Sequence, residues 1–480
     1  MFRFFFTTFL VLFYWITVSC TRVEQNGHVL SLIAEGQFSS AKEEINRLLK
    51  EGSLSMEKRS ELQFEMERME RIEKDFTKTE ADVLEFIRKY IPDVTAEDLR
   101  RWQAEKSLEM MMIDGEKRYF NRAARNLFRI DKACRQIWAD YYKDQPQPTP
   151  PADALDLDAH IKTIMAKATP DQPWVEPVRM RIDYTITVKP DQVPEGENIR
   201  CWIPFPREIP ERQRDIQLIS TFPETYYLAD KNHLQRTIYL EQPSAGNAET
   251  RFNVVYEYTS LGTYTAIDPD KVTAAKASGS LAEYLKEEPP HIVFTPQLRA
   301  LSQDIVGQEK NPYRIAQKLF EWVDTNIPWA SAREYSTIRS LSMYPYEHRH
   351  GDCGIQTLML ITLLRMNGIP ARWQSGWEFQ PPDDTMHDWG MIYFAPYGWI
   401  PMDVTYGLRD SDDQAHKWFY LNGMDSYRLI FNDAYSVPFD PPKEHFRSET
   451  VDSQRGELEW SGGNLYFDQW NWDMKWQVLK

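Results

Sequence analysis

Cysteine is scarce in this chain of 480 residues, which contains only Cys20, Cys134, Cys201 and Cys353. So few cysteines exclude a framework of several disulfides, and we expect Cys134 and Cys201 to be buried thiols. Positive charge is also lacking, because 56 Lys and Arg stand against 72 Asp and Glu and give a net charge of −16. This balance argues against nucleic acid and anionic lipid as the main partners.

Long hydrophobic runs are lacking as well, apart from residues 4–18, which end just before Ser19 and Cys20. The run is short for a membrane span and is typical of an export signal. A Cys after a small residue at the end of such a segment resembles a bacterial lipoprotein signal. The resemblance implies that the signal at 1–20 is removed and that Cys20 becomes a lipidated N-terminus. The protein would then be anchored in the bacterial cell envelope, on the periplasmic or cell-surface side. The alternative is an ordinary cleaved signal with a chance Cys.

Residues 21–144 show mostly helical periodicity. Asp114-Gly115 between residues 110–113 and 116–120 is a two-residue hairpin signal inside this helical region. The region is either a structural module or a platform for a protein partner, and the sequence favours neither.

The periodicity changes to two after a Pro-rich linker at 145–156. Apolar and polar residues alternate along 178–188, and further short alternating runs with turn signals predict a β-sandwich-like domain at 172–265. Helical patterns return near residue 270. A tail rich in Trp at 441–480 predicts a C-terminal β extension. The fold class expected is therefore α+β with several domains.

The candidate chemistry lies between residues 346 and 407. Gly351-Asp352-Cys353-Gly354 opens an apolar stretch that is closed by Gly368. This pattern predicts a buried helix with Cys353 in its first turn. Unpaired N–H groups and the helix dipole favour an anion there, so we expect the thiol to be biased toward the reactive thiolate.

His387 and Asp403 fall on two neighbouring expected strands, residues 387–394 and 398–406. A register that places Trp389 opposite Asp403 puts His387 on the same face, within diagonal reach of the carboxylate. A Cys, a His and a carboxylate are the minimum set for an activated thiol nucleophile.

Gly-Asp-Cys before an apolar helix ending in Leu-Leu-Arg-x-x-Gly-Ile-Pro-Ala-Arg, then His-x-Trp-x-x-Ile-Tyr and Gly-Trp-x-x-x-Asp, resembles the transglutaminase-like core of the papain-like cysteine enzymes. The resemblance implies a core at 270–440, in which a helix bearing the Cys packs on an antiparallel sheet bearing the His and Asp. It makes Cys353 the nucleophile, His387 the base and Asp403 the orienting carboxylate. Val404 stands where a Pro commonly follows the Asp in the family.

Other polar residues near these motifs are given less specific roles. Asp388 should point to the strand face opposite His387, and we expect it to be a solvated carboxylate. Trp329 and Tyr344 are both candidates for the family's oxyanion-stabilising residue. His348 and His350 lack further ligands at metal-binding spacing, so neither a metal nor a cofactor is expected.

The resemblance implies a thiol hydrolase that attacks amide bonds of peptides or cell-wall peptides through a thioester acyl-enzyme. Two alternatives remain open. The same three residues could serve a protein-glutamine acyltransferase that crosslinks proteins, or the core could be a catalytically silent binding module.

Overall fold

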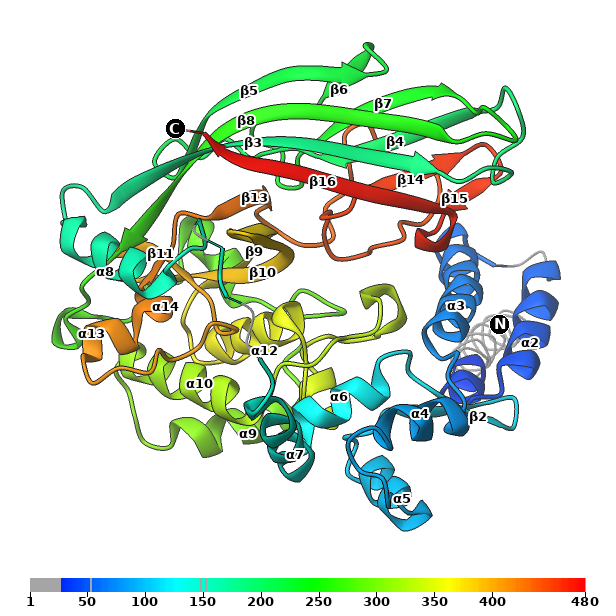
Figure 1. The fold of residues 1–480 in the computed structure, drawn as a ribbon, viewed down its shortest axis with the longest axis horizontal. Coiled ribbons are helices and arrows are strands. Elements are labelled where there is room, and N and C mark those ends of the chain that lie inside the picture. Colours follow the sequence, from blue (N-terminus) through cyan, green and yellow to red (C-terminus); the bar gives the residue numbers. More distant parts are fainter. Residues whose placement is uncertain (1–26, 52–53, 147–148, 152, 480) are drawn as a thin grey trace, which may run out of the picture. The chain divides into compact units, whose positions relative to one another are not determined.

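The computed structural model describes residues 27–479 except for 52–53, 147–148 and 152, so the expected signal and Cys20 lie outside the described residues. The fold is α+β, and the chain divides into two compact units, Met1–Lys143 and Asp144–Lys480 (Figure 1). Within the described part of the chain, no helix has the length and apolar character needed to cross a membrane.

The first unit is helical around one hydrophobic core. Its hairpin joins β1 (Met110–Ile113) to β2 (Glu116–Tyr119) through Asp114 and Gly115, both at positive φ, which confirms the hairpin prediction. The helices of this unit include α2 (Phe38–Lys50), α3 (Met56–Asp75), α4 (Glu80–Ile87), α5 (Ala96–Ala104), α6 (Ala123–Ile130) and α7 (Lys132–Lys143). Capping boxes at Thr79 and Thr95 start α4 and α5.

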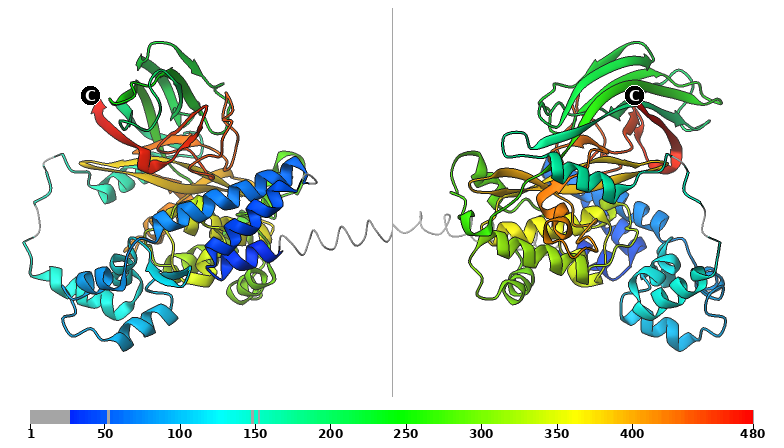
Figure 2. Two further views of the ribbon diagram at one scale, coloured as in Figure 1. Left: turned by 90° about the vertical axis from the view of Figure 1, so that its right-hand side faces the viewer. Right: turned by 60° about the vertical axis from the view of Figure 1, so that its left-hand side comes forward.

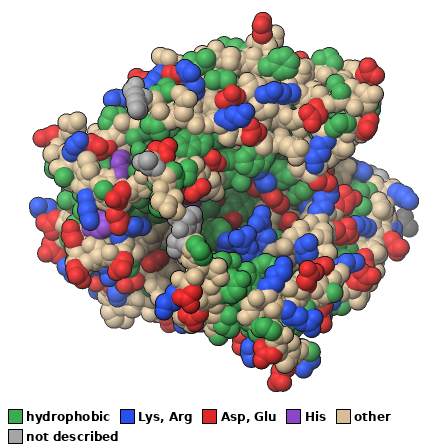
Figure 3. All heavy atoms as spheres, viewed as in Figure 1, with side chains coloured by type: hydrophobic (Ala, Val, Ile, Leu, Met, Phe, Trp, Pro, Cys, Tyr) green, Lys and Arg blue, Asp and Glu red, His purple; other side chains and the backbone are tan. Residues whose placement is uncertain are grey.

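The second unit begins with α8 (Leu157–Lys167) and contains two five-stranded antiparallel sheets around a shared core. One sheet is built from β3 (Trp174–Val188), β5 (Gln213–Phe222), β8 (Thr250–Tyr264), β12 (Gly423–Met424) and β16 (Trp470–Leu479). The other is built from β4 (Asn198–Pro204), β6 (Tyr226–Leu228), β7 (Thr237–Pro243), β14 (Glu457–Trp460) and β15 (Gly463–Leu465). Over the sandwich face seen in Figure 3, side chains of both charges are interspersed with hydrophobic ones.

The Trp-rich tail supplies strands to both of these sheets. β16 pairs with β3 over its whole length, and β14 pairs with β4. Trp472 lies edge-on to Trp377 at 5.3 Å between ring centroids. The tail therefore completes the sandwich and also contacts the next layer of the unit.

That next layer is a four-stranded antiparallel sheet in the order β11 (Gly398–Met402), β10 (Asp383–Phe394), β9 (Ala371–Gln380) and β13 (Arg428–Asn432). Figure 2 shows this sheet between the sandwich and a group of helices. The helices are α9 (Pro296–Val306), α10 (Pro312–Asn326), α11 (Tyr344–His348) and α12 (Cys353–Met366). The short helices α13 (Gln414–Lys417) and α14 (Phe419–Asn422) follow β11.

Helix α12 is the central helix of this layer, as its apolar sequence predicts. The Asp352 side chain accepts a hydrogen bond from the Ile355 N–H and starts the helix, and Gly368 at a φ of +73° follows its end. Every residue from 354 to 365 is buried, so α12 packs on all its faces. Cys134 and Cys201 are buried and unbridged, which confirms that expectation.

The predicted register of β10 against β11 is also confirmed. Tyr393 pairs with Trp399 and Gly390 with Met402. Continuing this register by one residue places Trp389 opposite Asp403. His387 and Asp403 therefore share a face of the sheet.

Gly376 on β9 provides a test of how tightly the sheet is assembled. A Cβ at this position would lie 1.8 Å from the carbonyl oxygen of Leu429 on β13. Because backbone cannot yield as a side chain can, we expect Gly376→Ala to lower the free energy of unfolding by about 3 kcal/mol. Urea unfolding of the full chain measures this loss. Gly279→Ala is the control, because a Cβ at this position would meet no atom. Its φ of +61° alone should lower the free energy of unfolding by about 1 kcal/mol. Equal losses at both sites would contradict the prediction.

Candidate active site

The structure brings His387 and Asp403 together. The Nε2 atom of His387 lies 2.7 Å from Oδ2 of Asp403, and the two residues are 3% and 0% exposed. The Thr405 N–H donates to the other carboxylate oxygen of Asp403 at 3.1 Å. Among the described residues, the Nδ1 atom of His387 has no hydrogen-bond partner. The imidazole is thus held from one nitrogen, and the other is left available.

A buried arginine from β13 lies on the same carboxylate. Arg428 donates to Asp403 Oδ2 at 2.9 Å and to Asp425 at 2.8 Å, and its Nη1 is 3.3 Å from Glu378 Oε2. Glu378 Oε2 is also 3.6 Å from Nε2 of His387. Two cationic groups and three carboxylates therefore compensate one another away from water, which is the condition under which buried charges are tolerated.

These charges shift the pKa values of His387 and Asp403, which together form the dyad of this site. Burial alone would lower the pKa of His387, but the carboxylates of Asp403 and Glu378 outweigh it and raise that pKa. Burial would raise the pKa of Asp403, but His387 and Arg428 together hold it below its usual range. Each group therefore raises the tendency of the other to carry its charge.

Cys353 begins α12, as predicted, but its sulfur is bonded elsewhere. Its thiol donates to Oδ2 of Asp388 at 3.3 Å. Within the described part of the chain, no hydrogen bond joins Cys353 to His387. Because successive residues of a strand point to opposite faces, His387 and Asp388 leave β10 in opposite directions. The structure thus forms two pairs, Cys353 with Asp388 and His387 with Asp403.

The prediction that Asp388 is a solvated carboxylate is wrong. Asp388 is 2% exposed, and Gln454 donates to its Oδ1 at 2.8 Å. Tyr335 lies with its hydroxyl 3.1 Å from Oδ2. The strand face was predicted correctly, but that face is covered by the start of α12 and by the segment after β13, so water is excluded.

The expected bias of Cys353 toward thiolate is also not met. The residue is partly exposed, yet the protein packed around its sulfur raises the pKa of the thiol well above its ordinary value. The carboxyls of Asp388 and Asp352 raise it further, because a thiolate would add a like charge beside them.

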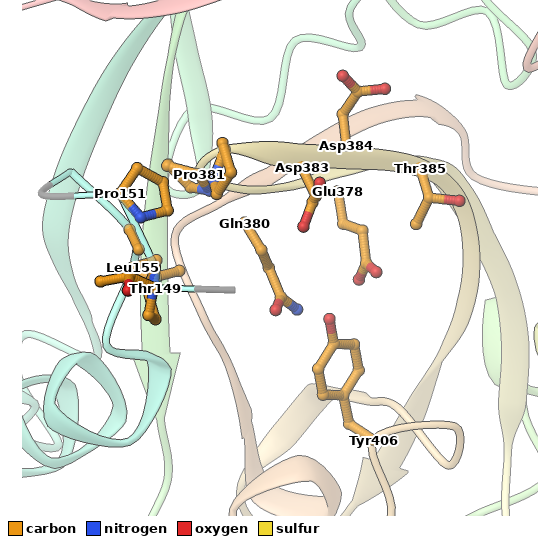
Figure 4. Close-up of a pocket in the computed structure, with 13 residues that line it drawn as sticks. Thr149, Pro151, Leu155, Glu378, Gln380, Pro381, Asp383, Asp384, Thr385 and Tyr406 are labelled. Atoms are coloured by element: carbon orange, nitrogen blue, oxygen red, sulfur yellow. The ribbon is translucent and has the colours of Figure 1, made fainter. Parts of the chain in front are cut away.

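A cavity of about 740 Å³ lies beside the dyad (Figure 4). Its walls are the turn of the β9–β10 hairpin, Tyr406, and residues 149–151 and 154–155 of the linker. Figure 4 shows Glu378 and Asp383 directed toward Tyr406. Since Glu378 is also a neighbour of His387, the cavity and the dyad share a wall.

The two oxyanion candidates have different surroundings. The backbone of Trp329 forms a bridge with Gly351, two residues before Cys353. Tyr344 is buried and stacks on His348 at 4.2 Å between ring centroids. Among the residues described, no group of His, Cys, Asp and Glu is placed to hold a metal ion.

The family model of the transglutaminase-like superfamily matches residues 299–404, a range that includes Cys353, His387 and Asp403. This segment is a transglutaminase-like domain. It supports a papain-like cysteine enzyme in general terms. No protein with a curated description matches the chain.

Solved structures similar to the chain include two bacterial proteins. A proposed cysteine protease from Cytophaga hutchinsonii has 16% identity and a TM-score of 0.41, covering 64% of this chain and 92% of its own. The periplasmic domain of TgpA from Pseudomonas aeruginosa has 13% identity and a TM-score of 0.25, covering 57% of this chain and all of its own.

Sequence analysis of the transglutaminase-like domain missed two sets of site residues. Arg428 lies beyond the matched segment, and nothing in its local sequence marks it as a partner of Asp403. Gln454 lies well beyond the matched segment, and Tyr335, although inside it, lies outside the motifs. Asp388 was visible beside His387, but only the packing of α12 shows which strand face is covered.

The raised pKa of His387 gives a pH-dependent prediction. Because the folded-state pKa of His387 is raised above its ordinary value, its protonation stabilises the fold at low pH. This stabilisation is lost as the pH rises through the folded-state pKa. We expect Asp403→Asn to lower the pKa of His387, because burial remains while the nearest carboxylate is lost. NMR titration of the His387 ring measures the pKa. His445→Ala removes a histidine distant in sequence and should leave this titration unchanged. An unaltered His387 pKa in Asp403→Asn would contradict the assignment.

Proposed function

We propose that the chain is a cysteine hydrolase of amide bonds in which Cys353 is the nucleophile, His387 the base and Asp403 the residue that orients the base. The observation that supports this proposal best is the hydrogen bonding of His387, which is held at Nε2 by Asp403 while Nδ1 has no partner among the described residues. A general base needs one nitrogen held and the other able to accept a proton.

The reaction would begin with a rearrangement at the start of α12 that brings the sulfur of Cys353, bonded to Asp388 in this structure, to Nδ1 of His387. The thiol proton passes to Nδ1, and the thiolate attacks the amide carbonyl. His387 then gives this proton to the departing amine, leaving a thioester on Cys353. Water, deprotonated by His387, hydrolyses the thioester and restores the thiol.

The substrate class proposed is a peptide or a cell-wall peptide. The cavity beside the dyad is of a size that accommodates peptide side chains, and it shares Glu378 with the surroundings of His387. Transfer of the acyl group to an amine, which would crosslink proteins, uses the same three residues. It differs only in whether the second reactant is an amine or water.

We further propose that the protein is exported and anchored to a membrane of the bacterial cell envelope through a lipid on Cys20. The support is the apolar run at residues 4–18, which ends at Ser19-Cys20. The region before residue 144 would then be a structural module or a platform for a protein partner.

A second candidate is a catalytically silent binding module. It is favoured by one observation, namely that the thiol of Cys353 is bonded to Asp388 rather than to His387 and has a raised pKa. A thiol that never reaches the imidazole would be chemically inert.

The rate at which iodoacetamide alkylates Cys353 distinguishes enzyme from silent module. If His387 takes the thiol proton, His387→Ala should slow labelling at pH 7 by at least about tenfold, since one pKa unit changes the thiolate fraction by that factor. Peptide-resolved mass spectrometry measures labelling of Cys353 separately from Cys134 and Cys201. His445→Ala is the matched histidine control and should label at the rate of the unaltered protein. Equal rates in all three proteins from pH 6 to pH 9 would favour the silent module.

Intact-mass analysis with a glutamine-containing peptide distinguishes hydrolysis from acyl transfer. We expect a thioester adduct on the protein that is absent in Cys353→Ala, and release of the free acid even when a primary amine is added. Formation of the peptide–amine product in preference to the acid would instead identify a crosslinking acyltransferase.

A further inference from the structure

We propose that Asp388 is a further active-site residue that keeps the nucleophile protonated: its carboxyl accepts the hydrogen bond of the Cys353 thiol and competes with His387 for the sulfur. This inference rests on the proposed function, because it concerns the same nucleophile. It adds a resting state in which the sulfur is held as a thiol until it turns toward the imidazole.

The geometry of Asp388 suits this role. Oδ2 accepts the thiol hydrogen bond at 3.3 Å, and Oδ1 accepts from Gln454 Nε2 at 2.8 Å. The same Gln454 amide group lies 3.1 Å from the carbonyl oxygens of His387 and Gly376, so the side chain that holds Asp388 is itself tied to β9 and β10. The carboxyl therefore has a fixed position at the start of α12.

Tyr335 links Asp388 to the cap of the same helix. Its hydroxyl is 2.8 Å from Oδ1 of Asp352 and 3.1 Å from Oδ2 of Asp388. A Cβ on Gly354 would lie 2.1 Å from the Tyr335 hydroxyl oxygen and 2.6 Å from Oδ2 of Asp388. A glycine at position 354 therefore leaves room for the Tyr335 hydroxyl and the Asp388 carboxyl beside the start of α12.

Among the described residues, the side chains that donate hydrogen bonds to Asp388 are those of Cys353, Tyr335 and Gln454, which carry no positive charge. The titratable groups that face it are Cys353 and Asp352 at the start of α12, Tyr335, and Asp452 in the segment after β13. Asp452 accepts a hydrogen bond from Ser375 of β9, and it is also influenced by Arg447 and Arg455. Arg455 itself is paired with Glu334.

Both partners of this hydrogen bond have raised pKa values. Burial, followed by the charges of Asp452 and Asp352, raises the pKa of Asp388. The pKa of Cys353 is raised by burial and then by Asp388. Once Asp388 is ionised, a thiolate beside it would be a second negative charge within 3.3 Å. The contact with Asp388 therefore favours the thiol over the thiolate.

His387 offers that other position. Its Nδ1 has no partner among the described residues, and its pKa is raised by Asp403 and Glu378 against the effect of burial. The two residues next to each other on β10 therefore provide opposite environments, one that favours thiol and one that favours thiolate with imidazolium. Which of them holds the sulfur decides whether the nucleophile is active.

The test is the pH profile of Cys353 alkylation in Asp388→Asn. The amide is close in size to the carboxyl but carries no charge, so the thiol should ionise at lower pH. We expect the midpoint of the profile to fall by about one pH unit or more, and labelling at pH 7 to rise about tenfold. Asp410→Asn removes an exposed carboxylate and should leave the profile unchanged. Near-UV circular dichroism checks that each variant keeps its tertiary packing. An unchanged or upward-shifted midpoint in folded Asp388→Asn would overturn the inference.

The double variant Asp388→Asn with His387→Ala separates this inference from the proposed function. If both hold, labelling at pH 7 is fast in Asp388→Asn and slow in the double variant. Fast labelling in both variants would retain the role of Asp388 and contradict that of His387. Slow labelling in Asp388→Asn alone would contradict the role of Asp388 whatever the effect of His387.

A measurement on the unaltered side chain covers the case in which Asp388→Asn fails to fold. The infrared S–H stretching band of Cys353 is obtained as the difference between the unaltered protein and Cys353→Ser. Donation to a carboxyl should lower the frequency of this band relative to an unbonded thiol. A band at the frequency of an unbonded thiol would overturn the inference.

Discussion

The candidate active site depends on the alternation of side chains along β10. A strand presents successive residues to opposite faces, so His387 and Asp388 cannot both take the same position relative to the helix that carries the thiol. The His387 face carries the dyad with Asp403 and the cation of Arg428. The Asp388 face meets the start of α12. The chemistry open to Cys353 is therefore decided by which of two adjacent side chains it contacts.

The two faces also differ in how their buried charges are compensated. Around Asp403, a guanidinium and an imidazole offset three carboxylates, so the pKa of Asp403 is lowered and that of His387 is raised although both groups are buried. Around Asp388, hydrogen bonds come from neutral donors, and protons rather than cations have to offset the negative charge. A buried carboxyl without a bonded cation has a raised pKa, and a thiol beside it does too. Two contrasting electrostatic environments are thus separated by the thickness of one strand.

Much of this arrangement could be predicted from the sequence, because it depends on local patterns. The cap at Asp352, the apolar stretch and Gly368 define α12, and the turn between β10 and β11 fixes a register that unites His387 with Asp403. The contact of Cys353 could not be predicted, since it depends on the twist of the sheet and on which face α12 covers. Arg428 and Gln454 were missed because their contacts with the motifs span 25 and 66 residues of sequence and follow no periodicity.

Strand β16 follows every other described element in the chain, yet all of it pairs with β3, from Arg179 to Val188. Until residues 470–479 emerge from the ribosome, β3 is an edge strand with unpaired backbone N–H and C=O groups, and the ring of Trp377 lacks its contact with Trp472. Folding of the second unit therefore has to be completed after translation of this segment and not progressively from the N-terminus. A nascent chain that lacks residues 470–479 would expose the edge of β3 to pairing with strands of other chains. Delaying the folding of this unit until residue 479 has been synthesised would therefore protect the chain from aggregation.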